Sequence, residues 1–341
     1  MGARLSTIVL AAPEGFYDVS ELVTPSQKKL MLFSGRSHPE LAEEIAQELG
    51  CEVSPTKLYD FANGEIFVRF EESVRGSDAF VLQAHAEPLN KSIMEQLIMV
   101  DALKRASAKR ITVITPFYGY ARQDKKHNGR EPITARLMAN LFATAGADRL
   151  MAVDLHTSQI QGFFDGPVDH LFALPILSDY VGKNVDRERL TIVSPDAGRV
   201  RVAERWTDVL GSPLAIIHKR RDPNVPNQVS VLEVVGDVQD RVCVIVDDMI
   251  DTGGTITKAA ETLFDEGAAE VVVTATHGVL SDPATERLKN SRISEVIVTD
   301  TLPIPTEHRF DKLTVLPIAP LIARAITEVF KDGSVTSLFR D

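Results

Sequence analysis

The stretch Val242-Cys-Val-Ile-Val-Asp-Asp-Met-Ile-Asp-Thr-Gly-Gly-Thr255 decides the fold of this chain. Its first five residues are apolar and mostly β-branched, which predicts a strand buried on both faces. Asp247 and Asp248 end the apolar run abruptly, and a helical pattern over 256–264 follows the glycines. The order of strand, acidic tip, Gly/Thr loop and helix predicts an anion cradle, because loop N–H groups and the positive helix end favour a phosphate.

The loop differs from the common phosphate loops, since no lysine follows its glycines and the G-x-G-x-x-G spacing is absent. The glycines permit close backbone approach, and the Thr252 and Thr255 hydroxyls can donate to phosphate oxygens. The two carboxylates accept from vicinal hydroxyls, so a ribose 5-phosphate fits the whole stretch. The alternative is a tight strand–helix turn with a solvated acidic tip. The stretch resembles the phosphoribosyl-pyrophosphate loop of the phosphoribosyltransferase fold.

Composition indicates an ordinary globular protein. The 341 residues are enough for two domains, and contents of 44% hydrophobic and 25% charged residues are typical of soluble proteins. The net charge of −11 argues against nonspecific nucleic-acid binding. Cys51 and Cys243 make no disulfide framework, and Cys243 is expected in the core. No apolar run reaches membrane length and no secretion signal is evident, which favours a cytoplasmic protein without membrane contact.

Strand and helix patterns alternate along the chain and predict an α/β fold of two phosphoribosyltransferase-like domains, each a mainly parallel sheet flanked by helices. Residues 1–27 show no strong periodicity and are expected to be an N-terminal extension. The predicted domains are 28–170 and 171–320, with 321–341 packing back on the first. Expected strands are 28–33, 78–83, 110–115, 149–153, 190–193, 213–217, 229–235, 242–246, 270–276, 295–299 and 312–316; expected helices are 39–49, 92–105, 134–144, 199–206, 256–264 and 321–330.

Polar clusters follow several of these strands, where ligands bind in open α/β sheets. Phe61, Asn63 and Glu65 could stack on and hydrogen-bond a purine, although an ordinary Asn-Gly hairpin turn is the simpler interpretation. Arg122 and Gln123 stand in a basic strand exit that suits a polyphosphate. The alternative for that segment is a solvated basic loop.

Two further clusters have the chemistry of phosphoryl transfer. His156 follows a strand and could reach a metal or phosphate together with Asp196, although a lone histidine is more often a structural group. Mg²⁺ prefers oxygen ligands, so this histidine is expected to act through water. Lys219, Arg220 and Arg221 begin a Pro-containing loop that could close over a transferring phosphate. The alternative is a basic surface loop.

Together the clusters resemble the ribose-phosphate pyrophosphokinase family, also called phosphoribosyl pyrophosphate synthetases, from about residue 29 to residue 339. The motifs are Phe-x-Asn-Gly-Glu, Tyr-Ala-Arg-Gln-Asp, Asp-x-His-x-Ser-Gln-Ile-Gln-Gly-Phe-Phe, Ser-Pro-Asp-x-Gly, Lys-Arg-Arg and Asp-Asp-Met-Ile-Asp-Thr-Gly-Gly-Thr. The resemblance implies transfer of the β,γ-diphosphoryl group of Mg-ATP to the C1 hydroxyl of ribose 5-phosphate. The products would be AMP and phosphoribosyl pyrophosphate for nucleotide, histidine and tryptophan biosynthesis.

The resemblance also implies roles for individual residues and a homo-hexamer with phosphate and ADP as effectors. The implied residues are Lys219 and Arg221 for catalysis; Phe61, Asn63, Gly64, Glu65, Arg122 and Gln123 for ATP; Arg221, Asp247, Asp248, Asp251, Thr252, Gly253, Gly254 and Thr255 for ribose 5-phosphate; His156 and Asp196 for Mg²⁺; and Ser73, Arg75, Ser334, Thr336 and Phe339 for the effectors. Two residues depart from the family pattern: Asn63 stands where many members carry Asp, and Asp222 alters the loop after Arg221.

Other interpretations remain open at this stage. A phosphoribosyltransferase would share the Asp247–Thr255 loop but would not need Arg122, His156 or Lys219. A non-catalytic regulatory relative should have damaged catalytic positions, whereas these are intact. A transcription regulator on this fold would need a DNA-binding appendage, and none is evident.

Overall fold

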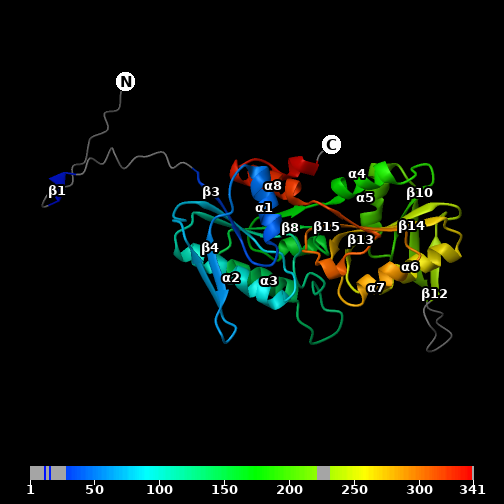
Figure 1. Ribbon diagram of the computed structural model, residues 1–341, viewed down its shortest axis with the longest axis horizontal. Coiled ribbons are helices and arrows are strands. Elements are labelled where there is room, and N and C mark those ends of the chain that lie inside the picture. The colour runs from blue at the N-terminus through cyan, green and yellow to red at the C-terminus, as the bar shows by residue number, and fades with distance from the viewer. Residues whose placement is uncertain (1–10, 13–14, 17–27, 221–230, 340–341) are drawn as a thin grey trace, which may run out of the picture.

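The computed structural model describes residues 11–12, 15–16, 28–220 and 231–339. Two sheets lie side by side and form the centre of the molecule (Figure 1). The first sheet has five strands, and all of its neighbouring strands are parallel. Each connection between neighbours therefore crosses from one end of the sheet to the other. In order across the sheet its strands are β3 (Leu30–Ser34), β6 (Asp78–Leu82), β7 (Arg110–Thr115), β8 (Arg149–Val153) and β9 (Val168–Leu171).

The second sheet is seven-stranded and parallel except for β12, which pairs antiparallel with β11 at one edge. Its centre is the apolar strand β13, whose flanking strands β10 and β14 keep it buried on both edges. In order across the sheet the strands are β12 (Val231–Val235), β11 (Leu214–Arg220), β10 (Leu190–Ser194), β13 (Val242–Ile250), β14 (Glu270–Gly278), β15 (Glu295–Thr299) and β16 (Leu313–Leu316). The fold class predicted from the sequence is confirmed.

Helices cover both faces of the two sheets, with α1, α4, α5 and α8 on one side and α2, α3, α6 and α7 on the other (Figure 1). One hydrophobic core under the first group contains residues from both sheets and from α8, among them Leu32, Val244 and Ile322. Helix α8 packs against α1, so the C-terminal segment lies on the first half of the chain. The helices are α1 (Pro39–Leu49), α2 (Leu89–Arg105), α3 (Thr134–Ala145), α4 (Leu174–Asn184), α5 (Val200–Leu210), α6 (Gly254–Asp265), α7 (Ala284–Asn290) and α8 (Ala319–Phe330).

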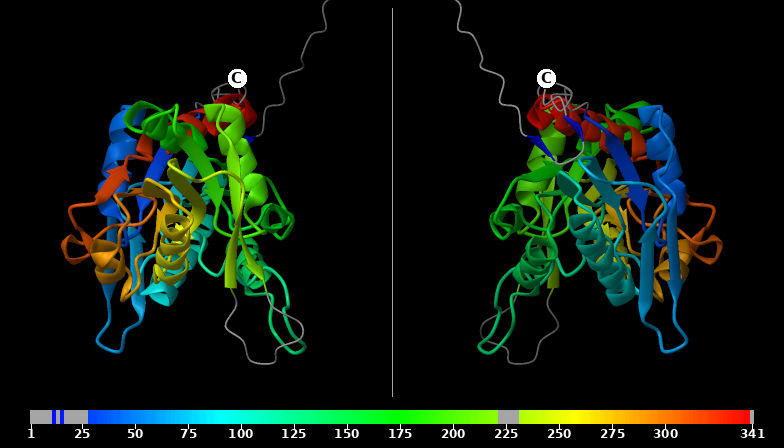
Figure 2. Two further views of the ribbon diagram at one scale, coloured as in Figure 1. Left: turned by 90° about the vertical axis from the view of Figure 1, so that its right-hand side faces the viewer. Right: turned by 90° about the vertical axis from the view of Figure 1, so that its left-hand side faces the viewer.

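A two-stranded hairpin, β4 (Thr56–Asp60) and β5 (Ile66–Phe70), stands apart from both sheets. It extends from the same side of the molecule as the segment between β7 and α3 (Figure 2). The hairpin interpretation of the Asn-Gly segment is therefore correct. Of the N-terminal extension, the structure describes only β1 (Ala11–Ala12) and β2 (Gly15–Phe16), which pair antiparallel.

Several expected elements have different bounds in the structure. Strand β13 does not end with its apolar run: it continues through both acids to Ile250, because parallel pairing with β14 persists to Gly278. The expectation that the helix after 198 ends at 206 is wrong, since α5 reaches Leu210. Strand β9 and helices α4 and α7 were not expected. Positions 229–230 of one expected strand lie outside the described residues.

The expectations for the cysteines hold, since Cys243 is buried in β13 and Cys51 is exposed, both as free thiols. Burial raises the pKa of the Cys243 thiol to about 12. In the part of the chain that the structure describes, none of the helices is long and apolar enough to cross a membrane.

Candidate active site

The Gly/Thr loop links the central strand of the second sheet to a helix and leaves that helix open to an anion. Gly253 takes a left-handed backbone conformation, with φ 71°, that favours glycine, and helix α6 begins at the next residue. No side chain caps the first turn of α6, so its N–H groups point toward the loop. Thr252 and Thr255 are exposed beside them. This arrangement suits a phosphate monoester.

A cavity of about 250 Å³ lies over this loop and is called the ribose cavity hereafter, after the ligand that the sequence predicts for the loop. It brings together residues from four separate strand exits, those of β7, β8, β10 and β13. Its lining includes Arg122, His156, Asp196, Arg199, Asp247, Asp248, Asp251, Thr252, Gly253, Gly254 and Thr255. Residues that the sequence assigned to ATP, Mg²⁺ and ribose 5-phosphate therefore share one cavity.

The acid pair Asp247 and Asp248 is held by a cation that the sequence analysis missed. The guanidinium of Arg199 lies 3.1 Å from Asp247 Oδ1 through Nε and 2.6 Å from Asp248 Oδ1 through Nη2. His156 Nδ1 lies 2.7 Å from Asp248 Oδ2 on the other side of that carboxylate. The side chains of Arg199 and Asp248 are only 14% and 7% exposed, so these contacts are shielded from water. A basic residue directly after Ser-Pro-Asp-x-Gly was the available signal.

The pKa values of the two acids are shifted in opposite directions. Burial raises the pKa of Asp247 well above its ordinary value, and the neighbouring Asp248 charge adds to that effect. Burial acts in the same direction on Asp248, but hydrogen bonding with His156 and the Arg199 charge lower its pKa to about 2. Asp248 is therefore the permanently charged member of the pair, and a single shared proton belongs on Asp247.

His156 and Asp196 are compatible with a magnesium ion that arrives with a nucleotide. Both line the ribose cavity, and Asp196 uses Oδ1 to accept from the N–H groups of Gly198 and Arg199. Within the described residues, no group of three or more His, Cys, Asp or Glu side chains could hold a metal on its own. Mg²⁺ is usually bound through one or two protein carboxylates together with waters and substrate phosphates, so such a sparse set fits it.

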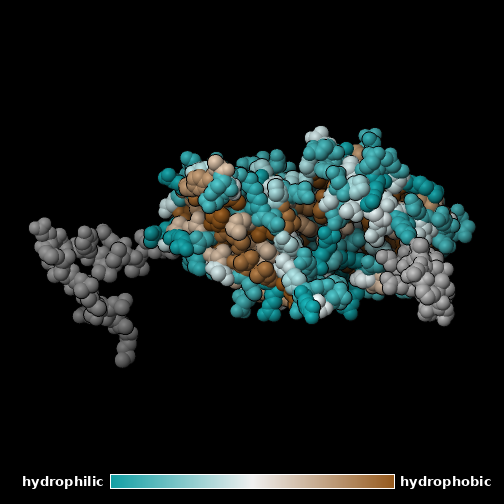
Figure 3. Space-filling model, turned by 90° about the horizontal axis from the view of Figure 1, so that it is seen from below, coloured by the Kyte–Doolittle hydropathy of each residue, from teal (hydrophilic) through white to brown (hydrophobic). Residues whose placement is uncertain are grey.

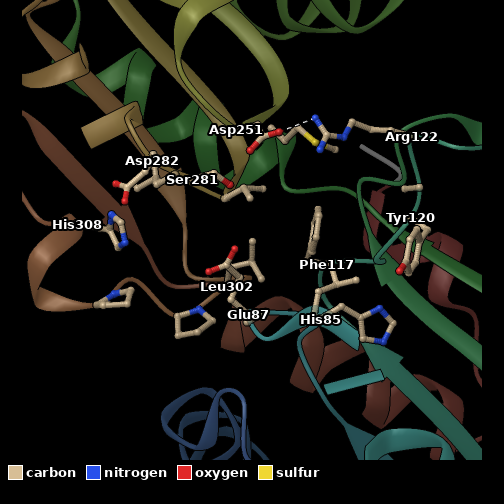
Figure 4. A pocket seen from close by; sticks show the side chains of 18 of the residues that line it. His85, Glu87, Phe117, Tyr120, Arg122, Asp251, Ser281, Asp282, Leu302 and His308 are labelled. Atoms are coloured by element: carbon tan, nitrogen blue, oxygen red, sulfur yellow. Dashed lines mark hydrogen bonds and ion pairs between the residues drawn. The ribbon is translucent and has the colours of Figure 1, made fainter. Parts of the chain in front are cut away.

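Arg122 connects the ribose cavity to a larger interdomain cavity of about 500 Å³. Its Nη1 lies 2.7 Å from Asp251 Oδ2, and both residues line both cavities (Figure 4). Gln123 lines the interdomain cavity as well, and its Oε1 accepts from Thr134 Oγ1 at 2.5 Å. Phe117 and Leu302 form part of an apolar floor from the two halves of the chain (Figure 4).

The predicted adenine contacts are not close to these cavities. Phe61, Asn63 and Glu65 lie at the tip of the β4–β5 hairpin, and Phe61 is 46% exposed. Phe61 packs with Tyr59 and Phe67 in an aromatic cluster, and Asn63 Oδ1 accepts from the Glu65 N–H. Neither cavity is lined by the hairpin tip. Within one chain the structure does not bring the tip to Arg122.

The remaining predicted residues fall in two other places. Lys219 is near the end of β11, where its backbone pairs with Leu232, and Arg221 lies outside the described residues. The Phe339 ring meets Phe172 edge-on at 5.3 Å between centroids. The other predicted effector residues, Ser73, Arg75, Ser334 and Thr336, are exposed.

Comparison with known proteins identifies the family of this chain. Residues 30–146 match the family described as the N-terminal domain of ribose phosphate pyrophosphokinase, and residues 217–340 match the phosphoribosyl synthetase-associated domain. The chain is 71% identical over 316 residues to a ribose-phosphate pyrophosphokinase of Streptomyces coelicolor, covering 93% of this chain and 98% of that protein. It is 62% identical over 317 residues to the Mycobacterium tuberculosis enzyme of the same name, covering 93% and 97%.

A solved structure gives the same result in three dimensions. The crystal structure of phosphoribosylpyrophosphate synthetase from Mycobacterium smegmatis superposes with a TM-score of 0.86 at 61% sequence identity. The match covers 90% of this chain and 100% of that chain, so it includes both sheets and the loop between β13 and α6. With identities this high over nearly the whole length, this chain belongs to the ribose-phosphate pyrophosphokinase family.

Proposed function

We propose that this chain transfers the β,γ-diphosphoryl group of Mg-ATP to the C1 hydroxyl of ribose 5-phosphate. The products are AMP and 5-phosphoribosyl 1-pyrophosphate, which supplies nucleotide, histidine and tryptophan biosynthesis. The observation that carries this proposal is that Arg122, His156 and Asp196 line the same cavity as the Asp251–Thr255 loop. A phosphoribosyltransferase would need the loop but not the three residues around it.

Ribose 5-phosphate is assigned to the ribose cavity on the chemistry of its lining. The 5-phosphate fits the open start of α6, where free N–H groups and the Thr252 and Thr255 hydroxyls can donate to it. The sugar hydroxyls fit Asp247 and Asp248, which can accept from them. The nucleotide phosphates then lie toward Arg122, His156 and Asp196.

In the reaction, the C1 hydroxyl oxygen forms a bond to the β-phosphorus while the bond from that phosphorus to the α–β bridging oxygen breaks. AMP leaves with the bridging oxygen, and the hydroxyl proton is lost to water. Bound Mg²⁺, held through His156 and Asp196, would add positive charge beside the phosphate oxygens. Catalysis of this kind depends on position and electrostatics, and we assign Lys219 and Arg221 to charge stabilisation at the transferred group.

Adenine binding requires a second copy of the chain in this proposal. The hairpin tip with Phe61 does not line either cavity, whereas the same half of the chain exposes Met94, Leu137 and Leu141 at 52%, 52% and 39%. Hydrophobic surface gathers over the first half of the chain in the face shown in Figure 3. Exposed apolar patches of this kind mark contact surfaces. A homo-hexamer, in which one copy's hairpin reaches a neighbour's Arg122, accounts for both observations.

The shared-site arrangement can be tested by mixing two inactive variants. If the hairpin acts on a neighbouring copy, Phe61→Ala and Lys219→Ala chains co-assembled from unfolded or dissociated protein should regain part of the activity. Some sites would then combine an intact hairpin with an intact catalytic loop. No recovery, in mixtures shown to be mixed oligomers by co-purification of one tagged variant with the other untagged variant, would place the hairpin and the loop of each site on one chain.

The overall function is tested by product analysis. Purified protein with Mg²⁺, ATP and ribose 5-phosphate should form AMP and phosphoribosyl pyrophosphate in equal amounts. Chromatography and ³¹P NMR measure the two products. Lys219→Ala serves as the control and should form both at a rate lower by about 10²-fold or more. Consumption of phosphoribosyl pyrophosphate with a free base, without AMP formation from ATP, would instead identify a phosphoribosyltransferase.

We further propose that phosphate and ADP regulate the enzyme at Ser73, Arg75, Ser334, Thr336 and Phe339. In support, Asp332 pairs with Lys28 and with Arg110 Nη1, which ties the C-terminal segment to the amino-terminal edge of the first sheet. Phe339 also contacts Phe172, and Phe172 lines a cavity that Asp247 and Asp248 line as well. An effector bound near the C-terminal segment would thus have a physical connection to the ribose cavity.

A further inference from the structure

Arg199 occupies the positions that a ligand of the acid pair would need. It precedes helix α5, and its guanidinium makes contacts with three residues: Asp247, Asp248 and His156. Nη1 donates to the His156 carbonyl oxygen at 3.0 Å. Nη2 also lies 2.7 Å from His156 Nδ1, the ring nitrogen that donates to Asp248 Oδ2. A planar guanidinium with several donors in a fixed fork matches the two carboxylates and the carbonyl oxygen.

These contacts involve three of the four carboxylate oxygens of the two acids. Arg199 takes Oδ1 of both carboxylates, and His156 takes Oδ2 of Asp248. The backbone N–H of Asp248 also donates to Asp247 Oδ1 at 2.8 Å. A sugar hydroxyl or a divalent cation that needs oxygens of this pair therefore meets Arg199 first.

The side chain has somewhere to go when it is displaced. Arg199 lines both the ribose cavity and a second cavity of about 360 Å³, hereafter the rear cavity. Apart from the acid pair, the rear cavity is lined by the one carboxylate of Asp154 and by two guanidinium groups, those of Arg201 and Arg205, which disfavour a third guanidinium there. The position between the two acids is thus the preferred one without ligand, and displacement has an electrostatic cost.

We infer that Arg199 is the resident counter-ion of the acid pair and competes with divalent cations and sugar hydroxyls for Asp247 and Asp248. The inference rests on the proposed function of the ribose cavity and adds to it what sets the affinity of the site. Arg199 holds two neighbouring carboxylates together in the empty site, and it leaves them when a stronger ligand arrives. Its removal frees the acceptors, so binding at the pair becomes tighter rather than weaker.

The test measures binding of Mn²⁺ alone, without nucleotide or turnover, by the EPR signal of free Mn²⁺ in titrations of the full chain. Arg199→Met should raise Mn²⁺ affinity by at least about fivefold, the lower end of typical coupling between two binding events. The matched control is Arg201→Met, which removes a neighbouring arginine that lines only the rear cavity. Its Mn²⁺ affinity should equal that of the unmodified chain.

Two further measurements assign the gain to this competition. Asp248→Asn combined with Arg199→Met should abolish the gain, because the negative charge that attracts Mn²⁺ is gone. Guanidinium chloride at millimolar concentration should lower the affinity of Arg199→Met back toward the original value, since it refills the vacated position. A merely structural role of Arg199 would produce neither effect.

Arg199→Lys keeps the test decisive if the Met variant does not fold. Lysine retains a charge but lacks the fork, so its gain should lie between those of the unmodified chain and the Met variant. An Mn²⁺ affinity that is unchanged or lower in the folded variants would overturn the inference. If the unmodified chain forms AMP but the Arg199 variants do not bind Mn²⁺ more tightly, only the counter-ion role is refuted. If the variants bind Mn²⁺ more tightly but the unmodified chain forms no AMP, only the proposed reaction is refuted.

Discussion

Asp247 is the residue on which sugar recognition depends most directly in the proposed function. Asp247→Asn should raise the KM for ribose 5-phosphate far more than the KM for ATP, because a charge-assisted hydrogen bond to a sugar hydroxyl is lost. Such a loss costs about 1.5–3 kcal/mol, or roughly tenfold or more in affinity. Because the pKa of Asp247 is raised, we expect the loss of binding free energy to be near the lower end of this range. Steady-state kinetics with each substrate varied in turn decides it, and equal changes in both KM values would contradict the assignment.

Asp300 is a buried acid whose charge opposes folding. Its Oδ1 accepts from the Ile318 N–H at 2.7 Å just before α8, and burial raises its pKa from 3.8 to about 6. The folded chain therefore binds this proton more tightly than the unfolded chain. Stability from this group is full below about pH 4 and falls as the pH rises through about 6, by up to about 3 kcal/mol.

Asp300→Asn should remove that fall while it keeps an acceptor for the Ile318 N–H. The variant is expected to unfold at higher urea concentration than the unmodified chain at pH 7.5, with the difference shrinking or reversing at pH 4.5. Urea titrations at the two pH values measure this directly. If the two proteins lose stability in parallel as the pH rises, then Asp300 does not titrate as a buried acid.

At the scale of elements, two cations, Arg36 and Lys91, contact the base of the β4–β5 hairpin at Asp60. Arg36 Nη2 contacts Asp60 Oδ1 at 2.7 Å, just before Phe61, while Nε contacts Glu95 Oε2 on helix α2 at 2.6 Å. The Glu95 side chain is only 3% exposed. Arg36→Met removes the cation paired with Glu95, which keeps hydrogen bonds from the Arg36 N–H and from Gln83. The variant should therefore destabilise the fold by about 3 kcal/mol, the lower end of the range for breaking a buried pair.

Lys91→Met is the matched control for this variant. Lys91 also contacts Asp60, at 2.5 Å, but its side chain is 43% exposed and Glu95 keeps its partner when it is removed. Such an exposed pair contributes at most about 1 kcal/mol. Urea unfolding of both variants decides between them: similar losses would mean that the Glu95 contact is not what anchors the hairpin.

The elements themselves were predictable wherever one pattern dominated. Strands at 110–115, 149–153 and 295–299 have the expected bounds, because each is a short apolar run between polar residues. Helix α7 was missed because only Ala284 and Leu288 are buried in it, which is too weak a periodicity to recognise. Helix α4 contains Pro175 at its start. In the sequence this proline indicates a helix break, although the first turn of a helix tolerates proline.

For the whole molecule, the proposed regulation by phosphate and ADP depends on the C-terminal segment. Ser334→Ala combined with Arg75→Ala should weaken phosphate activation and ADP inhibition while basal turnover stays detectable. The reason is that both residues match the family's effector pattern and neither lines the ribose cavity. Rates measured against phosphate and ADP concentration test this, and effector curves identical to those of the unmodified chain would remove both residues from the effector site.

The convergence of Arg122, His156 and Asp196 on the sugar loop could be expected, because ligands gather at the carboxyl ends of parallel strands. The contacts of Arg199 could not, since a long side chain at a helix start can reach many partners and only the tertiary arrangement selects them. The separation of the hairpin tip from the cavities could not be predicted either, because the motif at Phe61 indicates the chemistry of the tip but not its position.

The continuous core beneath α1, α4, α5 and α8 has a consequence for how such a chain can be divided or evolve. Leu32 and Leu41 of the first half share that core with Val244 of the second and Ile322 of the C-terminal helix. A polypeptide ending before residue 319 would leave the first half with an open apolar face, and a fragment beginning at residue 171 would carry α8 without its binding surface. Neither half is an exchangeable module, so recombination between relatives should succeed only when matching halves are inherited together.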